Sequence, residues 1–428
     1  MGAMDSSWWR RARAAAAASI ALATVAAPIF PARSLASADV DVDADVTTPA
    51  TLPATAPATE PSTQPAKQAS PSLFRDPEDG AFDVSNFLST RVGFLPIAMP
   101  ITEPAVGYGL ALGLSYFHDK PQAVTYPGKP PRVIMPSITA VFGAGTENGT
   151  WSAGLGHIGV WNKGKVRYVG AGGYANLQLD WFGRGDSLEG ESISYTNDVL
   201  FIYQKLTFKL GDTDFFLGPQ YRLLATDASF SDPPTAAGIP TGDVESQTSG
   251  LGAVLAFDSL DQPFSPTRGV RAEVSFSQQA EALGGDFDYG RLNYFGLGYV
   301  PLGEKLVLGV RVDGGLITGG EAPFYDLPGL IMRGIPRGRY VDDAALMTEA
   351  ELRYDVTRRW SVMGFGGVGR VAESFGDLGA ADNHGAVGTG FRYLIARQYG
   401  MRMGLDVGYG DDGDWTVYVT TGTGWVRP

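Results

Sequence analysis

Cysteine is absent from the 428 residues of this chain. The absence excludes a disulfide framework, a thiolate metal site and a cysteine nucleophile. Histidine occurs only at His118, His157 and His384, which lack the close spacing of metal ligands, so we predict no metal site and no cofactor. Charged residues make up only 18% of the chain, and the formal net charge of −13 argues against nucleic acid as a partner.

Long apolar runs are missing beyond the N-terminus, so no later segment has the length of a spanning helix. The N-terminus has a basic stretch at residues 8–13, an apolar run at residues 14–30, and the small residues Ala36, Ser37 and Ala38. This order is typical of a secretory signal, and we predict that residues 1–38 are a signal peptide cleaved after Ala38. A permanent membrane anchor is the alternative, which Pro28 and Pro31 disfavour.

Residues 39–71 have too little apolar surface to fold. Aspartates alternate with Val and Ala at the start, and prolines then recur at every fourth position from Pro49 to Pro65. This composition is typical of an extended, polyproline-like chain. We therefore predict a disordered, acidic and Pro/Ala/Thr-rich tether over residues 39–71, followed by one domain over residues 72–428.

Residues 348–355 carry the clearest pattern of that domain. At the strand period of two, Glu349, Glu351 and Arg353 point one way, whereas Leu352 and Tyr354 point the other way. The core of a soluble sheet protein cannot bury so many charges without large penalties. A membrane barrel can accept them, because its apolar side chains face lipid and its polar side chains face a wet lumen.

Strand patterns of this kind recur along residues 72–428, from about 90–100 to about 415–425, with the second and third near 104–117 and 132–144. They number about sixteen, an even number as in bacterial single-chain barrels. The prediction is an all-β fold: a transmembrane antiparallel β-barrel of about sixteen strands, located in the bacterial outer membrane. Outer-membrane lipid is then a partner, and we expect a monomeric barrel.

The longest connection, near residues 317–344, is glycine-rich and contains three arginines. Its motif residues are Arg333, Gly334, Arg337, Gly338, Arg339 and Tyr340. Such a loop has the length to enter and plug an acidic lumen. The alternative is a surface loop whose arginines contact lipopolysaccharide or water.

Three segments resemble one family. Met332-Arg333-Gly334-Ile335 is similar to the sixth-loop motif of the BamA/TamA outer-membrane assembly superfamily, the bacterial surface antigen barrels, with Ile in place of the usual aromatic residue. The strand at residues 349–354 resembles the acidic strand that follows this motif in the family. Asp258, Asp261, Pro263 and Gly269 match the turn between the eighth and ninth strands of the family.

The resemblance implies sixteen strands and a loop arginine paired with acids of the barrel wall. Arg333 would then meet Glu351 or Glu349, beside Arg353. A second acid of the family falls at Gly367 in this chain, a departure that leaves the arginine with fewer partners. The periplasmic transport modules of the family have no counterpart in residues 39–71. At the other end, Tyr418, Gly422 and Trp425 are predicted to be the C-terminal strand signal read by the assembly machinery.

We expect no enzymatic activity and a role in the insertion or translocation of client proteins or lipids at the outer membrane. The predicted mechanism is a weak seam between the first and last strands, thinned by glycines including Gly408 and Gly410, that opens to admit a client strand. Two alternatives remain open. One is a passive or gated pore, and the other is an outer-membrane hydrolase that uses Ser152 and His157.

Overall fold

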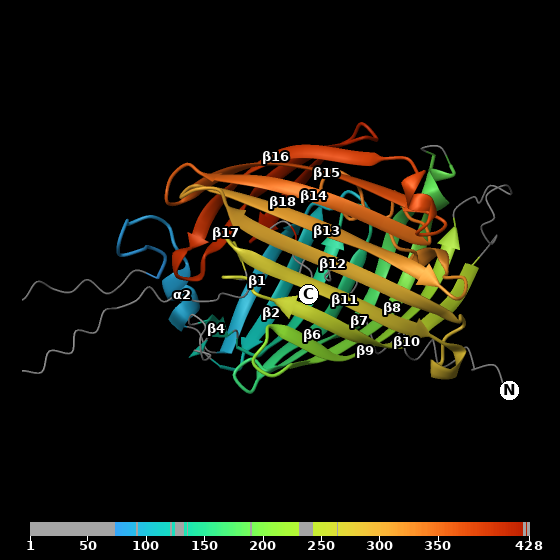
Figure 1. The fold of residues 1–428 in the computed structure, drawn as a ribbon, viewed down its shortest axis with the longest axis horizontal. Helices are drawn as coiled ribbons and strands as arrows, with labels where there is room; N and C mark the ends of the chain where they lie inside the picture. Colours follow the sequence, from blue (N-terminus) through green and yellow to red (C-terminus); the bar gives the residue numbers. More distant parts are fainter. Residues whose placement is uncertain are drawn as a thin grey trace, which may run out of the picture.

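The fold was determined from a computed structural model, which describes residues 73–90, 93–119, 122–124, 132–134, 136–188, 191–230, 243–262, 264–422 and 425. The predicted signal peptide, the predicted tether and Pro263 lie outside these residues. In the described part, one antiparallel sheet of sixteen strands curls into a barrel (Figure 1).

Each strand of the sheet pairs with its neighbour along the chain, apart from a small hairpin of β3 (Gln122–Val124) and β4 (Arg132–Ile134) between the second and third barrel strands. The barrel strands are β1 (Gly93–Ile101), β2 (Gly109–Phe117), β5 (Ile138–Thr146), β6 (Trp151–Trp161), β7 (Val166–Trp181), β8 (Ile193–Lys209), β9 (Phe215–Phe230), β10 (Asp243–Asp258), β11 (Gly269–Gln279), β12 (Tyr289–Pro301), β13 (Leu306–Thr318), β14 (Ala344–Asp355), β15 (Trp360–Ala372), β16 (His384–Ala396), β17 (Met401–Gly410) and β18 (Trp415–Thr421). The predicted number of strands and the predicted antiparallel order are confirmed.

Two predicted boundaries are wrong near the N-terminus. The second strand begins at Gly109, not near residue 104, because Gly107 has a positive φ of 78° and turns the chain first. The third strand was predicted over 132–144, but this stretch contains β4 and then β5, with Pro136 between them. A proline has no amide hydrogen for a ladder, so it separates the two strands.

The burial of side chains along β14 is the reverse of that in a soluble sheet. Glu349, Glu351 and Arg353 are 1%, 4% and 5% exposed, whereas Leu352 and Tyr354 on the other face are 43% and 45% exposed. The charged face therefore lies inside the barrel and the apolar face lies outside. An apolar outer surface around a polar interior is the arrangement expected of a barrel in lipid.

The two end strands of the sheet, β1 and β18, are not hydrogen-bonded strand partners. One hydrogen bond joins them in the described residues: the Val419 amide donates to Thr102 Oγ1 at 3.2 Å. We call this junction between β1 and β18 the seam.

A short segment before β1 lies across the end of the barrel that holds the turn between β14 and β15 (Figure 1). It contains α2 (Ser85–Thr90), and we call residues 73–90 the strap. Arg359, in the turn between β14 and β15, pairs with Asp76, Asp79 and Asp83 of the strap at 2.6 Å each. The Val84 amide also donates to the Ile395 carbonyl at 2.8 Å. The strap thus attaches the start of β1 to β16 and to the turn between β14 and β15.

The remaining helices are single 3-10 turns in connections: η1 (Arg184–Asp186), η2 (Glu281–Leu283), η3 (Phe324–Asp326), η4 (Asp377–Gly379) and η5 (Arg397–Tyr399). Among the described residues, every helix falls short of the length and hydrophobicity that a membrane-spanning helix needs.

Candidate functional site: the lumen loop and the seam

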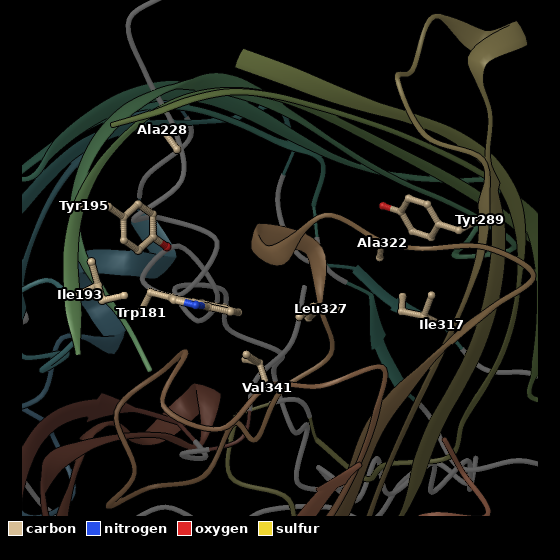
Figure 2. Packing of buried hydrophobic residues seen from close by; sticks show 9 residues of the cluster. All are labelled: Trp181, Ile193, Tyr195, Ala228, Tyr289, Ile317, Ala322, Leu327 and Val341. Atoms are coloured by element: carbon tan, nitrogen blue, oxygen red, sulfur yellow. The ribbon is translucent and has the colours of Figure 1, made fainter. Parts of the chain in front are cut away.

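The connection between β13 and β14, residues 319–343, folds into the barrel, and we call it the lumen loop. It is the sixth connection at its end of the barrel, as predicted. Its first half packs between opposite walls: Figure 2 shows Leu327 between Tyr195 and Ile193 on one side and Tyr289 and Ile317 on the other. The lumen loop is therefore a packed element of the interior and not a solvated surface loop.

Asp326 anchors this first half of the loop to two strands. It is bound by Arg222 of β9, with 2.6 Å between Nη1 and Oδ1, and by Arg291 of β12, with 3.1 Å between Nη1 and Oδ1. The Tyr289 hydroxyl donates to the same carboxylate. Two guanidinium groups therefore share one buried acid.

Arg333 anchors the second half of the loop, as the resemblance implied. Its guanidinium contacts Glu349 at 2.7 Å, Glu351 at 2.8 Å and Asp406 at 3.0 Å. The same group lies over the Phe365 ring, 3.8 Å from the centroid. All of these side chains are buried, so the removal of one partner would leave uncompensated charge in the interior.

Asp406 of β17 is the partner that the sequence reasoning missed. It also binds Arg392 of β16 through two contacts of 2.6 and 2.7 Å. The expectation that the arginine has fewer acids is therefore wrong, because Asp406 supplies the third carboxylate. Its inward face was visible in the alternation of β17, but nothing in the sequence linked it to a loop 73 residues away.

The structure also explains the missing acid at Gly367. A Cβ atom built at Gly367 would lie 2.4 Å from the sulfur of Met332, the residue before Arg333. The thioether of Met332 therefore occupies the space that a side chain at position 367 would need. Met332 packs there with other buried apolar residues of the loop and wall, including Leu330, Ile335 and Met347.

Gly334 brings the loop backbone against β17. Its φ is 103°, a conformation that favours glycine, and a Cβ atom there would lie 2.7 Å from Ala386 Cβ. Cβ atoms built at Gly408 and Gly410 would lie 2.9 Å from Gly334 Cα and 2.4 Å from Gly334 O. Gly408 and Gly410, which we expected to thin the seam, instead give the loop room to dock.

The next motif residues lie near the outer end of the loop. Tyr340 stacks on His384 with 3.6 Å between ring centroids, and its hydroxyl donates to Asp411 at 3.2 Å. Arg339 lies over the Phe182 ring at 4.5 Å from the centroid. Gly338 has a φ of 81° and turns the chain between these contacts.

The lumen loop contacts both sides of the seam. The Gly334 amide donates to the Tyr418 hydroxyl of β18 at 3.2 Å. On the other side, the Arg337 guanidinium lies 3.4 Å from Glu103, which follows β1. One short stretch of the loop therefore bridges β1 and β18, the two end strands that do not pair with each other.

The turn between the eighth and ninth barrel strands, β10 and β11, closes on Asp261, which accepts hydrogen bonds from the Thr267 amide at 3.0 Å and the Thr267 hydroxyl at 2.6 Å. A Cβ atom at Gly269 would lie 2.4 Å from the Ser259 carbonyl. Asp258 pairs instead with Arg167 of β7 at 2.9 Å.

Arg353 links this turn to β14. Its Nη2 donates to the Pro266 carbonyl at 3.4 Å, and its Nε lies 3.9 Å from Asp355. The turn also places Phe264 in a buried cluster with Ala396, Tyr399 and Met401 beneath the lumen. The fold therefore places two segments predicted from the sequence, the β10–β11 turn and the acidic strand β14, in contact.

Near the C-terminus, Trp425 lies inside the barrel. β18 ends at Thr421, and Gly422, with a φ of 79°, changes the direction of the chain. Trp425 is buried in a lumen cluster with Phe295, Leu297, Tyr299 and Val307, 5.5 Å from the Arg333 guanidinium. Recognition of Tyr418, Gly422 and Trp425 by the assembly machinery stays a prediction.

Ser152 and His157 do not form a hydrolase pair. They are five residues apart on β6 and therefore lie on opposite faces of the sheet. His157 Nδ1 is hydrogen-bonded to Thr139 at 2.8 Å instead. Within the described ranges, no group of three or more His, Asp or Glu side chains is arranged to hold a metal ion.

Comparisons with known proteins agree with this geometry. Residues 182–327 match the model of the Omp85 superfamily domain. The fold is similar to BamA from Haemophilus ducreyi lacking POTRA domains 1-3, with 14% identity and a TM-score of 0.54 over 77% of this chain and 70% of that chain. It is also similar to CdiB from Escherichia coli, with 11% identity and a TM-score of 0.51 over 76% of this chain and 61% of that chain.

No curated protein matches the sequence. The domain match and the fold similarity nevertheless agree with each other. The chain therefore has the fold of a BamA-like β-barrel, and its residues 182–327 resemble an Omp85 superfamily domain.

Proposed function

We propose that this barrel works by lateral opening of its seam, and that it inserts or translocates proteins or lipids at the outer membrane without enzymatic chemistry. The observation that carries the proposal is the position of the lumen loop. Gly334 and Arg337 reach Tyr418 and Glu103 on opposite sides of the seam. A shift of the loop would therefore release both edges together.

The weakness of the seam supports this mechanism. Adjacent strands elsewhere pair over seven or more residues, whereas β1 and β18 share the Val419–Thr102 hydrogen bond. Each backbone hydrogen bond contributes on the order of 1 kcal/mol net, so a one-bond junction opens far more easily than a full ladder. The seam is the place where the barrel wall can part.

The resemblance to the assembly superfamily supports a role in assembly or transport. The barrel is similar in fold to BamA from Haemophilus ducreyi, with a TM-score of 0.54. The lumen loop of this chain carries the family motif and makes the arginine contacts that the motif implies. These two features favour assembly or transport over a passive channel.

A disulfide across the seam tests the mechanism. Because the chain contains no cysteine, T102C/V419C introduces one defined crosslink. Full-length protein in liposomes would be assayed for folding of an added urea-denatured outer-membrane barrel and for transbilayer movement of fluorescent phosphatidylglycerol. We expect the oxidised variant to lose at least about fivefold in activity and reduction to restore it, because a closed seam admits no client.

The matched control is A98C/L112C, which joins β1 to its existing partner β2 at a register pair. This crosslink leaves the seam free, so activity should be retained. Full activity of oxidised T102C/V419C in both assays contradicts lateral opening. Absence of both activities in the wild-type protein, with a large steady conductance, establishes the pore instead.

The pore remains the second candidate because a cavity of about 520 Å³ lies inside the barrel. Bilayer conductance separates it from the plugged barrel. With the loop docked by Arg333, we expect only small, flickering currents in the wild-type protein and larger ones in R333A.

A further inference from the structure

The edge of β1 that faces the seam is short of hydrogen-bond donors. β1 contains Pro96 and Pro100, and both lie in a continuous antiparallel ladder with β2, opposite Leu114 and Leu110. Proline has no amide hydrogen, so it is tolerated where the missing N–H would point away from the partner strand. The missing donors of Pro96 and Pro100 therefore face the seam.

Along an antiparallel strand, the backbone N–H and C=O groups of successive residues point alternately to one side and the other. Residues 94, 96, 98 and 100 all direct their backbone groups toward the seam, since they differ by even steps. All four present a carbonyl, but only Phe94 and Ala98 also present an N–H. A client β-strand that joined this edge would find no N–H donor for its own carbonyls opposite Pro96 and Pro100, and unsatisfied groups are expensive in lipid.

The cavity inside the barrel reaches the seam from the other side. Its lining includes Met99 and Thr102 on the β1 side and Val419 and Thr421 on β18. Its volume, about 520 Å³, suits a small ligand or a headgroup and is too small for a folded hairpin. The seam is thus a boundary between this cavity and the bilayer.

The cavity is rich in arginine. Three carboxylates line it, those of Glu103, Glu273 and Asp313, and each already has a basic partner. Six arginines line it: Arg222, Arg271, Arg291, Arg311, Arg333 and Arg337. The lining therefore carries more positive than negative groups.

Arg271 is the arginine best placed to bind an added anion. It lies opposite Asp258 in the β10–β11 register, but Asp258 is bound by Arg167 at 2.9 Å. Among the described residues, the Arg271 guanidinium has no ion pair within 4.0 Å. Arg222 and Arg291 on the same side of the lumen share the single carboxylate of Asp326. Guanidinium groups bind phosphate through two parallel hydrogen bonds.

The outer surface beside the seam is apolar. Phe94 on β1 and Leu110 and Leu112 on β2 are exposed toward the bilayer. An amphiphile at the seam would therefore meet an apolar wall outside and guanidinium groups inside. A β-strand would meet the donor-poor edge of β1.

We propose that the substrate of the seam is a lipid with an anionic headgroup, whose phosphate enters the arginine-lined cavity while its acyl chains stay in the bilayer. This inference rests on the proposed function and names its substrate class. Client strands are excluded as the preferred substrate by Pro96 and Pro100.

Lipid binding by the full-length protein tests the cavity. Protein in neutral detergent would be mixed with phosphatidylglycerol or with phosphatidylcholine of the same acyl chains, and bound lipid counted by native mass spectrometry. We expect at least about fivefold more phosphatidylglycerol than phosphatidylcholine, and loss of this preference in R271Q. R268Q is the matched control. It removes the same charge three residues away, and Arg268 does not line the cavity.

Three results overturn the lipid assignment. The first is equal binding of the two lipids, and the second is an R271Q preference equal to that of the wild-type protein. The third is complete displacement of phosphatidylglycerol by inorganic phosphate at equal concentration, because the site would then bind a free anion with no contribution from acyl chains.

Peptide capture tests the β1 edge. A synthetic peptide with the sequence of residues 415–422 would be offered to protein carrying a photocrosslinker at position 98. We expect little capture by the wild-type barrel and several-fold more by P96A/P100A, which regains two N–H donors. Equal capture by both proteins, above that of a scrambled peptide, overturns the exclusion of client strands.

These outcomes are separable from failure of the seam mechanism. If oxidised T102C/V419C stays active, lateral opening fails whatever the lipid preference. If the oxidised variant is inactive but the two lipids bind equally, lateral opening stands and the lipid assignment fails.

Discussion

The walls on the two sides of β18 are held in very different ways. On one side, β14 and β17 are fixed to the lumen loop by Arg333, which three buried carboxylates bind within 3.0 Å. On the other side, β1 meets β18 through one hydrogen bond, and Arg337 reaches Glu103 with an exposed guanidinium. Removal of one partner from a buried ion cluster lowers the free energy of unfolding by about 3–5 kcal/mol. An exposed ion pair contributes at most about 1 kcal/mol. The barrel therefore combines a rigid wall with a weak one, and movement concentrates at the seam.

The largest expected effect comes from removing the anchor of the rigid wall. R333A leaves Glu349, Glu351 and Asp406 without their shared cation, so we expect a loss of about 3–5 kcal/mol in the free energy of unfolding. Urea unfolding in lipid vesicles, followed by tryptophan fluorescence, measures it. R337A is the control and should lose no more than about 1 kcal/mol, because its guanidinium is exposed. Equal losses in the two variants would show that the walls do not differ.

A smaller effect is expected where the loop backbone touches β17. In G410A the new methyl group would lie 2.4 Å from the Gly334 carbonyl, so the loop must shift. We expect a loss of about 1–3 kcal/mol in the free energy of unfolding, typical of overpacking. G364A on β15 is the matched control, because a Cβ atom there meets nothing within 4 Å. An unchanged G410A protein, with the loop still protected from protease, contradicts tight docking.

The smallest effect concerns the strap, which joins β1 to the rigid wall at the end of the barrel that holds the β14–β15 turn. Hydrogen bonding to Arg359 lowers the pKa of Asp79 to about 2, and hydrogen bonding to Arg397 lowers the pKa of Asp76. Because these pKa values lie below the ordinary value of 3.8, the aspartates stabilise the docked strap above pH 4 and lose this effect as the pH falls toward 2.

A single cysteine at Phe74, labelled with a spin probe, measures strap release by electron paramagnetic resonance. We expect the probe to become more mobile between about pH 4 and pH 2. The R359Q variant should show the mobile spectrum at neutral pH already. A spectrum that stays unchanged to pH 2 would contradict a strap held by these carboxylates.

Much of the barrel was predictable because its signals are local. The alternation of charged and apolar residues in β14 places Glu349 and Glu351 inside, whatever the rest of the chain does. Turn residues such as Asp261 and Gly269 close their own hairpin by bonds within ten residues. The pairing of Arg333 with the wall came from the family motif, and the structure bears out the contact.

The parts that could not be predicted depend on contacts between distant segments. Asp406, Arg222 and Arg291 each have an ordinary inward position, and only the folded loop selects them as partners of Arg333 and Asp326. The strap was included in the barrel domain without any role, since its aspartates resemble a solvated acidic stretch until Arg359 is placed beside them. Glycines were misinterpreted for the same reason: Gly408 and Gly410 thin the strand, but the loop fills the space.

The contact of Gly334 with Gly408 and Gly410 has a consequence for the order of folding. β17 packs directly on the loop backbone, because side chains at Gly408 and Gly410 would collide with Gly334, whereas the loop also rests on β8, β12 and β14. Docking of β17 against the loop is therefore a step that follows the approach of two distant segments. Such a step joins segments more than seventy residues apart, so it should be slow and come late in the biogenesis of the barrel.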